Sequence, residues 1–243
     1  MRKYLALLLF VPLISNAQLN KLVKKAKTAV TSKSTSGSSV GNLDIASALK
    51  EALDKGIDKQ VTKLTALDGF YKNPSVKILF PEELQKVDKA LRSVGLGSLA
   101  DEGIKSLNRA AEDAVKESTP IFVNAVKQMT FTDAKNILMG TDNAATSYLQ
   151  KSTQKPLYEK FTPKVQESIG NVGADKVWAT IITKYNSLPL VSKVNPDITD
   201  YVTNKALDGV YKMIAVEEKD IRNNLNSRTS DLLKKVFALQ DKK

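Results

Sequence analysis

Apolar residues recur at helical spacing from Leu43 almost to the end of the chain, and this pattern leaves few alternatives for the fold. The clearest stripe comes first and consists of Ile45, Leu49, Leu53, Ile57, Val61 and Leu64. It predicts one long amphipathic helix that ends near Leu67–Gly69. Alternation typical of a strand is confined to residues 74–80, which we expect to pack on the helices as an extended segment. Residues 43–243 are therefore predicted to form a single all-α domain, a multi-helix bundle with short loops.

Capping and breaking residues indicate where the later helices begin and end. Thr130 with Asp133 has the pattern of a capping box, and Asp197 precedes the last long helix. Thr229 is expected to cap a short helix near the C-terminus. Because proline removes a helical hydrogen bond, Thr162–Pro163 predicts that one helix ends and another begins there.

A short internal echo links two distant parts of the chain. Residues 66–72 (ALDGFYK) recur as residues 206–212 (ALDGVYK), but the flanking sequences do not match. We interpret the echo as coincidence, because so short a match does not make a repeat architecture. The second copy places Gly209 inside a helical pattern, where glycine costs about 1 kcal/mol relative to alanine. We expect Gly209 to allow another helix to approach closely.

The N-terminus has the layout of a secretory signal peptide: a basic head, an apolar stretch and small residues before the cleavage site. We expect residues 1–17 to be removed by cleavage between Ala17 and Gln18. This predicts export, with the periplasm as the favoured location and the extracellular space as the alternative. Residues 18–42 combine a basic amphipathic segment with a flexible Ser-rich linker. Within them, residues 18–30 could contact a membrane surface.

The sequence has no cysteine and no histidine. Their absence excludes disulfides, thiol nucleophiles and the Ser-His-Asp arrangement, and it removes the commonest zinc ligand. We assign no catalytic residue, no cofactor and no metal site. The net charge is +11, yet seven positive residues precede the first acid, Asp44, so residues 44–243 carry only +4. This mild charge, without a dense basic face, argues against nucleic-acid binding.

Carboxylates are the remaining candidates for catalysis, as in enzymes that hydrolyse glycosidic bonds. The candidate acids are Asp197, Asp200, Asp208, Glu217 and Glu218. Two of them have a simpler interpretation on a helix surface, because Asp208 can pair with Lys212, and Glu218 with Arg222, one turn away. Ser47–Lys50 matches the Ser-x-x-Lys motif of penicillin-interacting enzymes, but no Lys-Thr-Gly follows, so we interpret it as part of a helix surface.

Arginine is rare after the predicted signal peptide and occurs only at Arg92, Arg109, Arg222 and Arg228. Because its planar head makes several hydrogen bonds, each arginine is expected to hold structure together or to bind an anion. Tyr185, at a predicted helix end, could line a pocket or could equally belong to a packed helix terminus. We therefore single out one polar set for ligand or partner binding, which consists of Arg109, Tyr185, Asp200, Asp208, Arg222 and Arg228.

Several segments together resemble a known family. They are residues 68–74 (DGFYKNP), 128–135 (QMTFTDAK), 184–189 (KYNSLP), 197–223 and 228–237, in collinear order. They resemble an exported bacterial family known only as domain of unknown function four-one-nine-seven, over about residues 43–237. The resemblance implies a helical, exported bacterial domain. It implies no activity, cofactor or catalytic residue.

Together these observations predict an exported helical module of the bacterial cell envelope that binds an envelope protein or an apolar ligand between its helices. The alternative is a carboxylate-dependent hydrolase of envelope polymers, which requires a cleft with two facing acids. We favour the binding module. The lining of the largest pocket distinguishes the hypotheses, since an apolar tunnel favours lipid, an acid-lined cleft favours the hydrolase and a flat patch favours a protein partner.

Overall fold

The computed structural model describes residues 41–82, 85–93, 95, 97–171, 175, 176, 178, 179, 183, 186, 187, 189, 190, 193 and 197–241. All of them belong to one compact unit, residues 40–243. The predicted signal peptide with its cleavage site between Ala17 and Gln18, the basic segment and nearly all of the linker lie outside the described residues.

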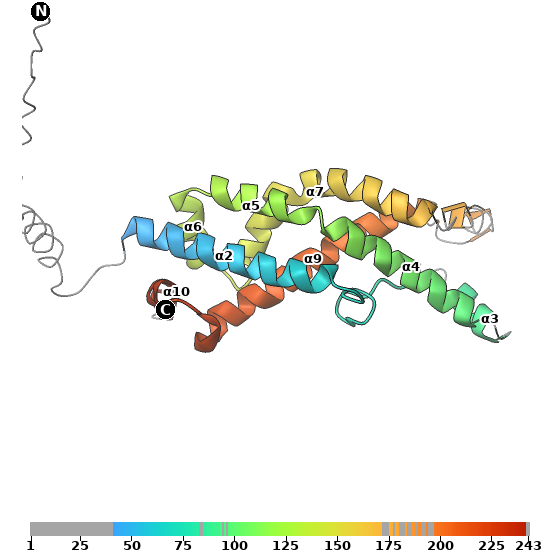
Figure 1. Ribbon diagram of the computed structural model, residues 1–243, viewed down its shortest axis with the longest axis horizontal. Coiled ribbons are helices and arrows are strands. Elements are labelled where there is room, and N and C mark those ends of the chain that lie inside the picture. Colours follow the sequence, from blue (N-terminus) through green and yellow to red (C-terminus); the bar gives the residue numbers. More distant parts are fainter. Residues whose placement is uncertain are drawn as a thin grey trace, which may run out of the picture. The chain divides into compact units, whose positions relative to one another are not determined.

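Helices form the regular secondary structure, and none of the described residues lies in a strand. In chain order the elements are α2 (Asn42–Thr65), α3 (Gln85–Ser93), α4 (Gly97–Val115), α5 (Ser118–Gln128), α6 (Phe131–Leu138), α7 (Ala144–Gly170), α9 (Ile198–Asn223), the short 3-10 helix η2 (Leu225–Ser227) and α10 (Asp231–Phe237) (Figure 1). The predicted all-α fold class is confirmed.

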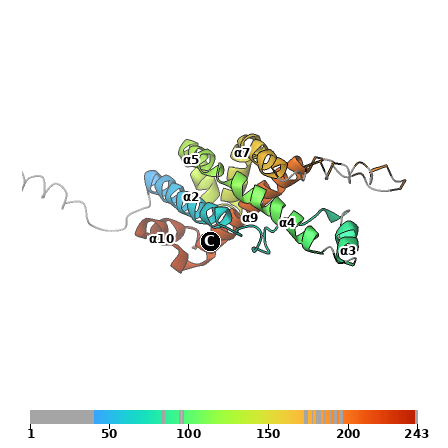
Figure 2. The same cartoon turned by 45° about the vertical axis from the view of Figure 1, so that its right-hand side comes forward.

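The core lies where α2 and α9 meet the other helices. α2 buries its predicted stripe, and the side chains of Ile45, Leu49, Leu53, Ile57, Val61 and Leu64 are at most 8% exposed. Each such burial contributes about 1.5–3 kcal/mol relative to leaving the side chain in water. α9 packs against α2, α4 and α7 and crosses the other helices in both views (Figures 1 and 2). The periodicity of the sequence thus identified the faces that form the core.

The prediction of a break at Thr162–Pro163 is wrong, because α7 continues through both Pro156 and Pro163. Proline in a helix interior costs about 3 kcal/mol. On either side of Pro163, Phe161 and Val165 are fully buried, in a helix that packs against α4, α5 and α9. Tertiary packing of this face outweighs the local preference of proline to end a helix.

The predicted caps are confirmed at two helices and shifted at a third. In the capping box of α6, the Thr130 hydroxyl accepts the Asp133 amide at 3.1 Å, and the Asp133 carboxylate accepts the Thr130 amide at 3.0 Å. The Asp197 carboxylate accepts two backbone amides in the first turn of α9. At α10 the cap is Ser230 and not the predicted Thr229. Each of these contacts joins residues at most three positions apart, so the sequence predicts the position of each cap to within one residue.

The two copies of the internal echo adopt different structures. Residues 66–72 form turns after α2, whereas residues 206–212 lie in α9. Gly209 is crowded, but by the ring of Phe70: a Cβ added to Gly209 would lie 2.6 Å from Phe70 Cε1. The expected close helix approach is therefore replaced by an aromatic side chain from a loop.

Residues 74–80 do pack on the helices, as predicted. Val76 and Ile78 are buried, in a stretch that has turns followed by irregular backbone. The stretch forms no sheet pairing among the described residues. Side chains from two helices hold it instead: Asn108 of α4 bonds the backbone of Ile78, and the Tyr201 hydroxyl of α9 donates to the Leu79 carbonyl at 2.8 Å.

Candidate functional site

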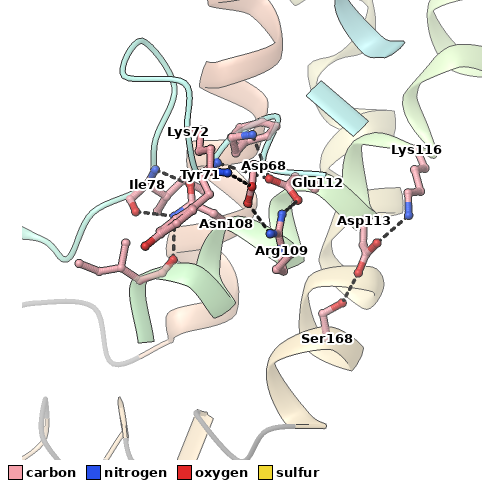
Figure 3. A network of polar contacts seen from close by, with 12 residues as sticks. Asp68, Tyr71, Lys72, Ile78, Asn108, Arg109, Glu112, Asp113, Lys116 and Ser168 are labelled. Carbon is pink, nitrogen blue, oxygen red and sulfur yellow. Dashed lines mark hydrogen bonds and ion pairs between the residues drawn. The ribbon is translucent and has the colours of Figure 1, made fainter. Parts of the chain in front are cut away.

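Arg109 on α4 holds the loop that follows α2 (Figure 3). Its guanidinium donates to Asp68 in that loop and to Glu112 on α4. Glu112 is buried, and its Oε1 also accepts the backbone amides of Phe70 and Tyr71 at 3.0 and 3.3 Å. The network therefore satisfies loop backbone groups that burial would otherwise leave without partners.

Asn108, the neighbour of Arg109, fixes the next part of the same loop. Its Oδ1 accepts the Ile78 amide at 2.8 Å, and its Nδ2 donates to the Ile78 carbonyl at 2.8 Å (Figure 3). At the loop's first turn, the hydrogen bond from Lys72, followed by that from Arg109, lowers the pKa of Asp68 below its ordinary value. Arg109 thus acts as a structural anchor in a loop network.

Arg222 and Glu218 on α9 form an ion pair with 2.8 Å between Nη2 and Oε1. The prediction placed this pair on the helix surface; instead, the two side chains are 2% and 7% exposed. Glu218 accepts the amides of Ala145 and Thr146, each at 2.8 Å, and so caps the positive end of α7. Arg222 donates to the carbonyls of the last two residues of α6, at 2.7 and 3.2 Å. The pair is buried because it joins the end of α6 to the start of α7.

Arg228, which is 2% exposed, closes the C-terminal end of α9. Its guanidinium donates to the carbonyls of Ile221 and Arg222 at 3.1 and 2.7 Å. It also donates to both carboxylate oxygens of Asp241, at 2.5 and 2.8 Å, and these hydrogen bonds lower the pKa of Asp241. The ring of Phe237 lies 5.4 Å from the guanidinium carbon. Arg228 therefore ties the chain after α10 to the end of α9.

The described members of the polar set that we singled out from the sequence lie in separate parts of the structure. Arg222 and Arg228 come together at the end of α9, whereas Arg109 serves the loop after α2. Asp200, in the first turn of α9, accepts the Tyr158 hydroxyl at 2.7 Å, and this hydrogen bond raises the pKa of Tyr158. Asp208 is exposed on α9. The remaining member, Tyr185, lies outside the described residues.

A pocket of about 300 Å³ opens between α2, α9 and the segment from η2 to α10. We call it the α2–α9–α10 pocket; its lining residues are Ala52, Lys55, Gly56, Lys59, Glu217, Ile221, Asn226, Ser227, Thr229 and Leu233. Its volume is at the lower end of the range for small-molecule sites. A smaller cavity of about 30 Å³ shares Ala52 and Ile221 with it.

Glu217 is the single carboxylate among the described residues that line this pocket. It is 8% exposed, and its two oxygens accept the Lys59 ammonium and the Gln60 amide, each at 2.6 Å. Gly56 makes room for it, since a Cβ at that position would lie 3.2 Å from Glu217 Cγ. Glu217 thus already has hydrogen-bond partners within the fold.

Most of the pocket was not predicted from the sequence. Glu217 was named as a candidate acid, but Lys55, Lys59, Ser227 and Thr229 were not named as binding residues. The one available signal was the pair of lysines spaced four residues apart on α2. Recognising the site also requires α9 and α10 to lie against α2, and that packing has no local signature in the sequence.

The described residues contain no group of three or more acidic side chains that could hold a metal ion. None of the helices in the described ranges combines the length and the apolar character needed to cross a membrane.

The fold and its networks define an all-helical protein in which buried arginines and acids fasten helix ends, with a small pocket of mixed polarity between three helices. The chain belongs to the family described as "Protein of unknown function (DUF4197)", whose model matches residues 39–238. The resemblance predicted from the sequence is thereby confirmed. Comparisons with curated proteins and with solved structures gave no match.

Proposed function

We propose that the chain is an exported helical binding module and that the α2–α9–α10 pocket is its ligand site. The observation that carries the proposal is the pocket itself, which has about 300 Å³ of space at the meeting point of three helices. Ala52, Ile221 and Leu233 supply apolar surface, and lysine, hydroxyl and amide groups supply the polar part. Polar and charged residues make up six of the ten lining residues, and a concave site that places polar groups beside apolar surface can orient a small molecule.

Binding is better supported than the alternative hydrolase. Hydrolysis of a glycosidic bond by paired acids needs two carboxyl groups that face each other across the substrate. Among the described residues, Glu217 is the one acid that lines the α2–α9–α10 pocket, and Glu218 is the one acid that lines the smaller cavity. Both carboxylates are held by partners within the protein, Glu217 by Lys59 and Gln60 and Glu218 by Arg222. No observation on the described residues favours catalysis by these acids.

Export remains part of the proposal and rests on the signal-peptide pattern of residues 1–17. We propose the periplasm as the location, with a membrane-surface contact through residues 18–30. Mass spectrometry of the periplasmic fraction should find a mature chain that begins at Gln18. An intact N-terminus on protein confined to the cytosol would contradict export. Equal sedimentation with liposomes of the mature chain and of a chain lacking residues 18–30 would contradict the membrane contact.

The binding site can be tested by NMR titration of the full-length chain with a set of small amphipathic compounds. We expect the largest shifts of amide signals at pocket residues such as Gly56 and Thr229. Thr229→Phe should weaken binding, because Thr229 is an exposed lining residue and a ring there narrows the opening. Thr62→Phe is the matched control, since Thr62 is exposed on α2 but does not line the pocket. Shifts confined to other surfaces, or equal binding by both variants, would contradict the proposal.

A further inference from the structure

The polar lining of the α2–α9–α10 pocket offers hydrogen-bond donors from five side chains, and two of these side chains are lysines. Lys55 and Lys59 lie one turn apart on α2 and line the same wall. The facing segment contributes Asn226, Ser227 and Thr229. Each ammonium already has an ion-pair partner, Lys55 in Glu51 and Lys59 in Glu217, so the lining favours an anion through its N–H and O–H donors and not through an excess of positive charge.

The lysines are placed to meet a ligand because they remain partly exposed. The side chains of Lys55 and Lys59 are 53% and 48% exposed. The Lys55 ammonium lies 2.7 Å from Glu51 and 3.4 Å from the Thr229 hydroxyl, so it reaches from α2 to the facing segment. An ammonium is a compact point charge with three donors and can add an oxygen of a ligand to the partners it has.

Glu217 repels an anionic ligand less strongly than a carboxylate without partners would. Both of its oxygens are occupied, one by the Lys59 ammonium and the other by the buried Gln60 amide. The ion pair with Lys59 compensates its charge within the fold. The Lys55 ammonium does not contact Glu217, and its hydrogen bonds to Glu51 and Thr229 leave one of its three N–H groups for an incoming anionic group.

The rest of the lining is apolar and defines the other end of the ligand. Ile221 and Leu233 are buried side chains that face the pocket from α9 and α10, and Ala52 faces it from α2. The smaller cavity also has Ala52 and Ile221 in its lining, but its volume is only about 30 Å³. A short apolar group fits this space, whereas a long acyl chain does not.

We propose that the α2–α9–α10 pocket binds a small organic anion with a short apolar tail. This inference rests on the proposed function and names the ligand class of the same pocket. The anionic head contacts Lys55 and Lys59, the hydroxyl and amide groups of the facing segment surround it, and the tail covers Ile221 and Leu233. Because the head is bound by partly exposed charges, affinity falls as the salt concentration rises.

The test uses the full-length chain and four probes in NMR titrations: hexanoate, acetate, inorganic phosphate and hexylamine. Hexanoate should shift the signals of pocket residues at lower concentration than acetate or phosphate, which lack the tail, and than hexylamine, which reverses the charge. Lys55→Gln and Lys59→Gln should each weaken hexanoate binding about 5-fold, since each removes one charge-assisted contact. Lys63→Gln, an exposed lysine of α2 outside the pocket, should leave hexanoate binding unchanged.

The outcomes separate the ligand class from the pocket's role. If hexylamine shifts the pocket signals and hexanoate does not, the preference for an anion is wrong while the pocket remains a binding site. If Lys55→Gln, Lys59→Gln and Lys63→Gln bind hexanoate equally, the lysines do not hold the head and the inference fails. If no probe and no compound of the amphipathic set shifts any pocket signal, the inference and the proposed function fail together. Circular dichroism of each variant confirms that the helices are retained.

Discussion

Replacing Arg222 by methionine should be among the most damaging single changes in the C-terminal half of the chain. The Arg222 side chain is 2% exposed and donates twice to Glu218 Oε1, at 3.0 and 2.8 Å. It also donates to the carbonyls of Ile137 and Leu138 at 2.7 and 3.2 Å. Arg222→Met therefore leaves a buried carboxylate without its counter-charge and removes the partners of two carbonyls at the end of α6.

The expected loss is about 3 kcal/mol, at the lower end of the roughly 3–5 kcal/mol observed when one partner of a buried ion pair is removed. The lower end applies because the Glu218 carboxylate keeps three donors at the start of α7: the Ala145 amide, and the amide and hydroxyl of Thr146. Such a loss is a large part of the roughly 5–15 kcal/mol by which a typical domain is stable.

Urea unfolding followed by circular dichroism measures this loss as a lower midpoint with an unchanged slope. Arg92→Met is the matched control, because Arg92 is 42% exposed and its ion pairs with Asp88 and Asp101 are open to water. It should change the midpoint far less. In the double variant Glu218→Gln/Arg222→Met, the loss should be smaller than the sum of the two single losses, since the charges are removed together.

Two results would refute this reasoning. The first is a urea midpoint for Arg222→Met equal to that of Arg92→Met. It would mean that the buried Glu218–Arg222 pair contributes no more to stability than the exposed ion pairs of Arg92. The second is strict additivity in the double variant, which would mean that the two side chains do not interact.

Three further changes test other contacts. Gly209→Ala should lower the free energy of unfolding in urea by about 1–3 kcal/mol, because the added Cβ meets the Phe70 ring. The control Gly170→Ala places its Cβ in open space and should leave the free energy of unfolding unchanged or raise it by up to ~1 kcal/mol. Equal effects of the two changes would contradict this. Burial raises the pKa of Tyr211 to about 12, so the stability of the protein should fall as the pH rises from about 10, where the unfolded tyrosine ionises, towards 12. The stability of the Tyr211→Phe variant should fall less steeply over this pH range, and an equal fall would contradict the assignment. Asn108→Ala should speed amide exchange in the loop that it holds, and unchanged exchange would contradict its anchoring role.

The sequence was most informative where the stabilising contacts are local. The α2 stripe, the capping box of Thr130 and Asp133 and the Asp197 cap all follow from residues a few positions apart, and the structure contains each of them. Periodicity identifies a buried face because one side of a helix returns every three to four residues. Caps are visible because a side chain reaches an amide two or three residues ahead.

Local rules failed where distant residues decide the outcome. The proline at Thr162–Pro163 was expected to end a helix, yet α7 passes through it because its buried face packs on other helices. Glu218 and Arg222 were correctly paired but wrongly placed at the surface. Their helical spacing is visible in the sequence, whereas the ends of α6 and α7 that bury them are not.

For this protein, the sequence alone determined the helical class, the family and the caps of α6 and α9, because these depend on periodic patterns, short-range hydrogen bonds and collinear motifs. Only the tertiary structure decided which arginines are buried anchors, why Gly209 must be small and where a pocket opens. The Arg222 anchor and the pocket depend on how α9 and α10 pack against helices from earlier in the chain, and Gly209 is small because of the loop that carries Phe70. Arg228 is buried because the chain after α10 folds back onto the end of α9. Neither helical periodicity nor a cap pattern specifies such contacts.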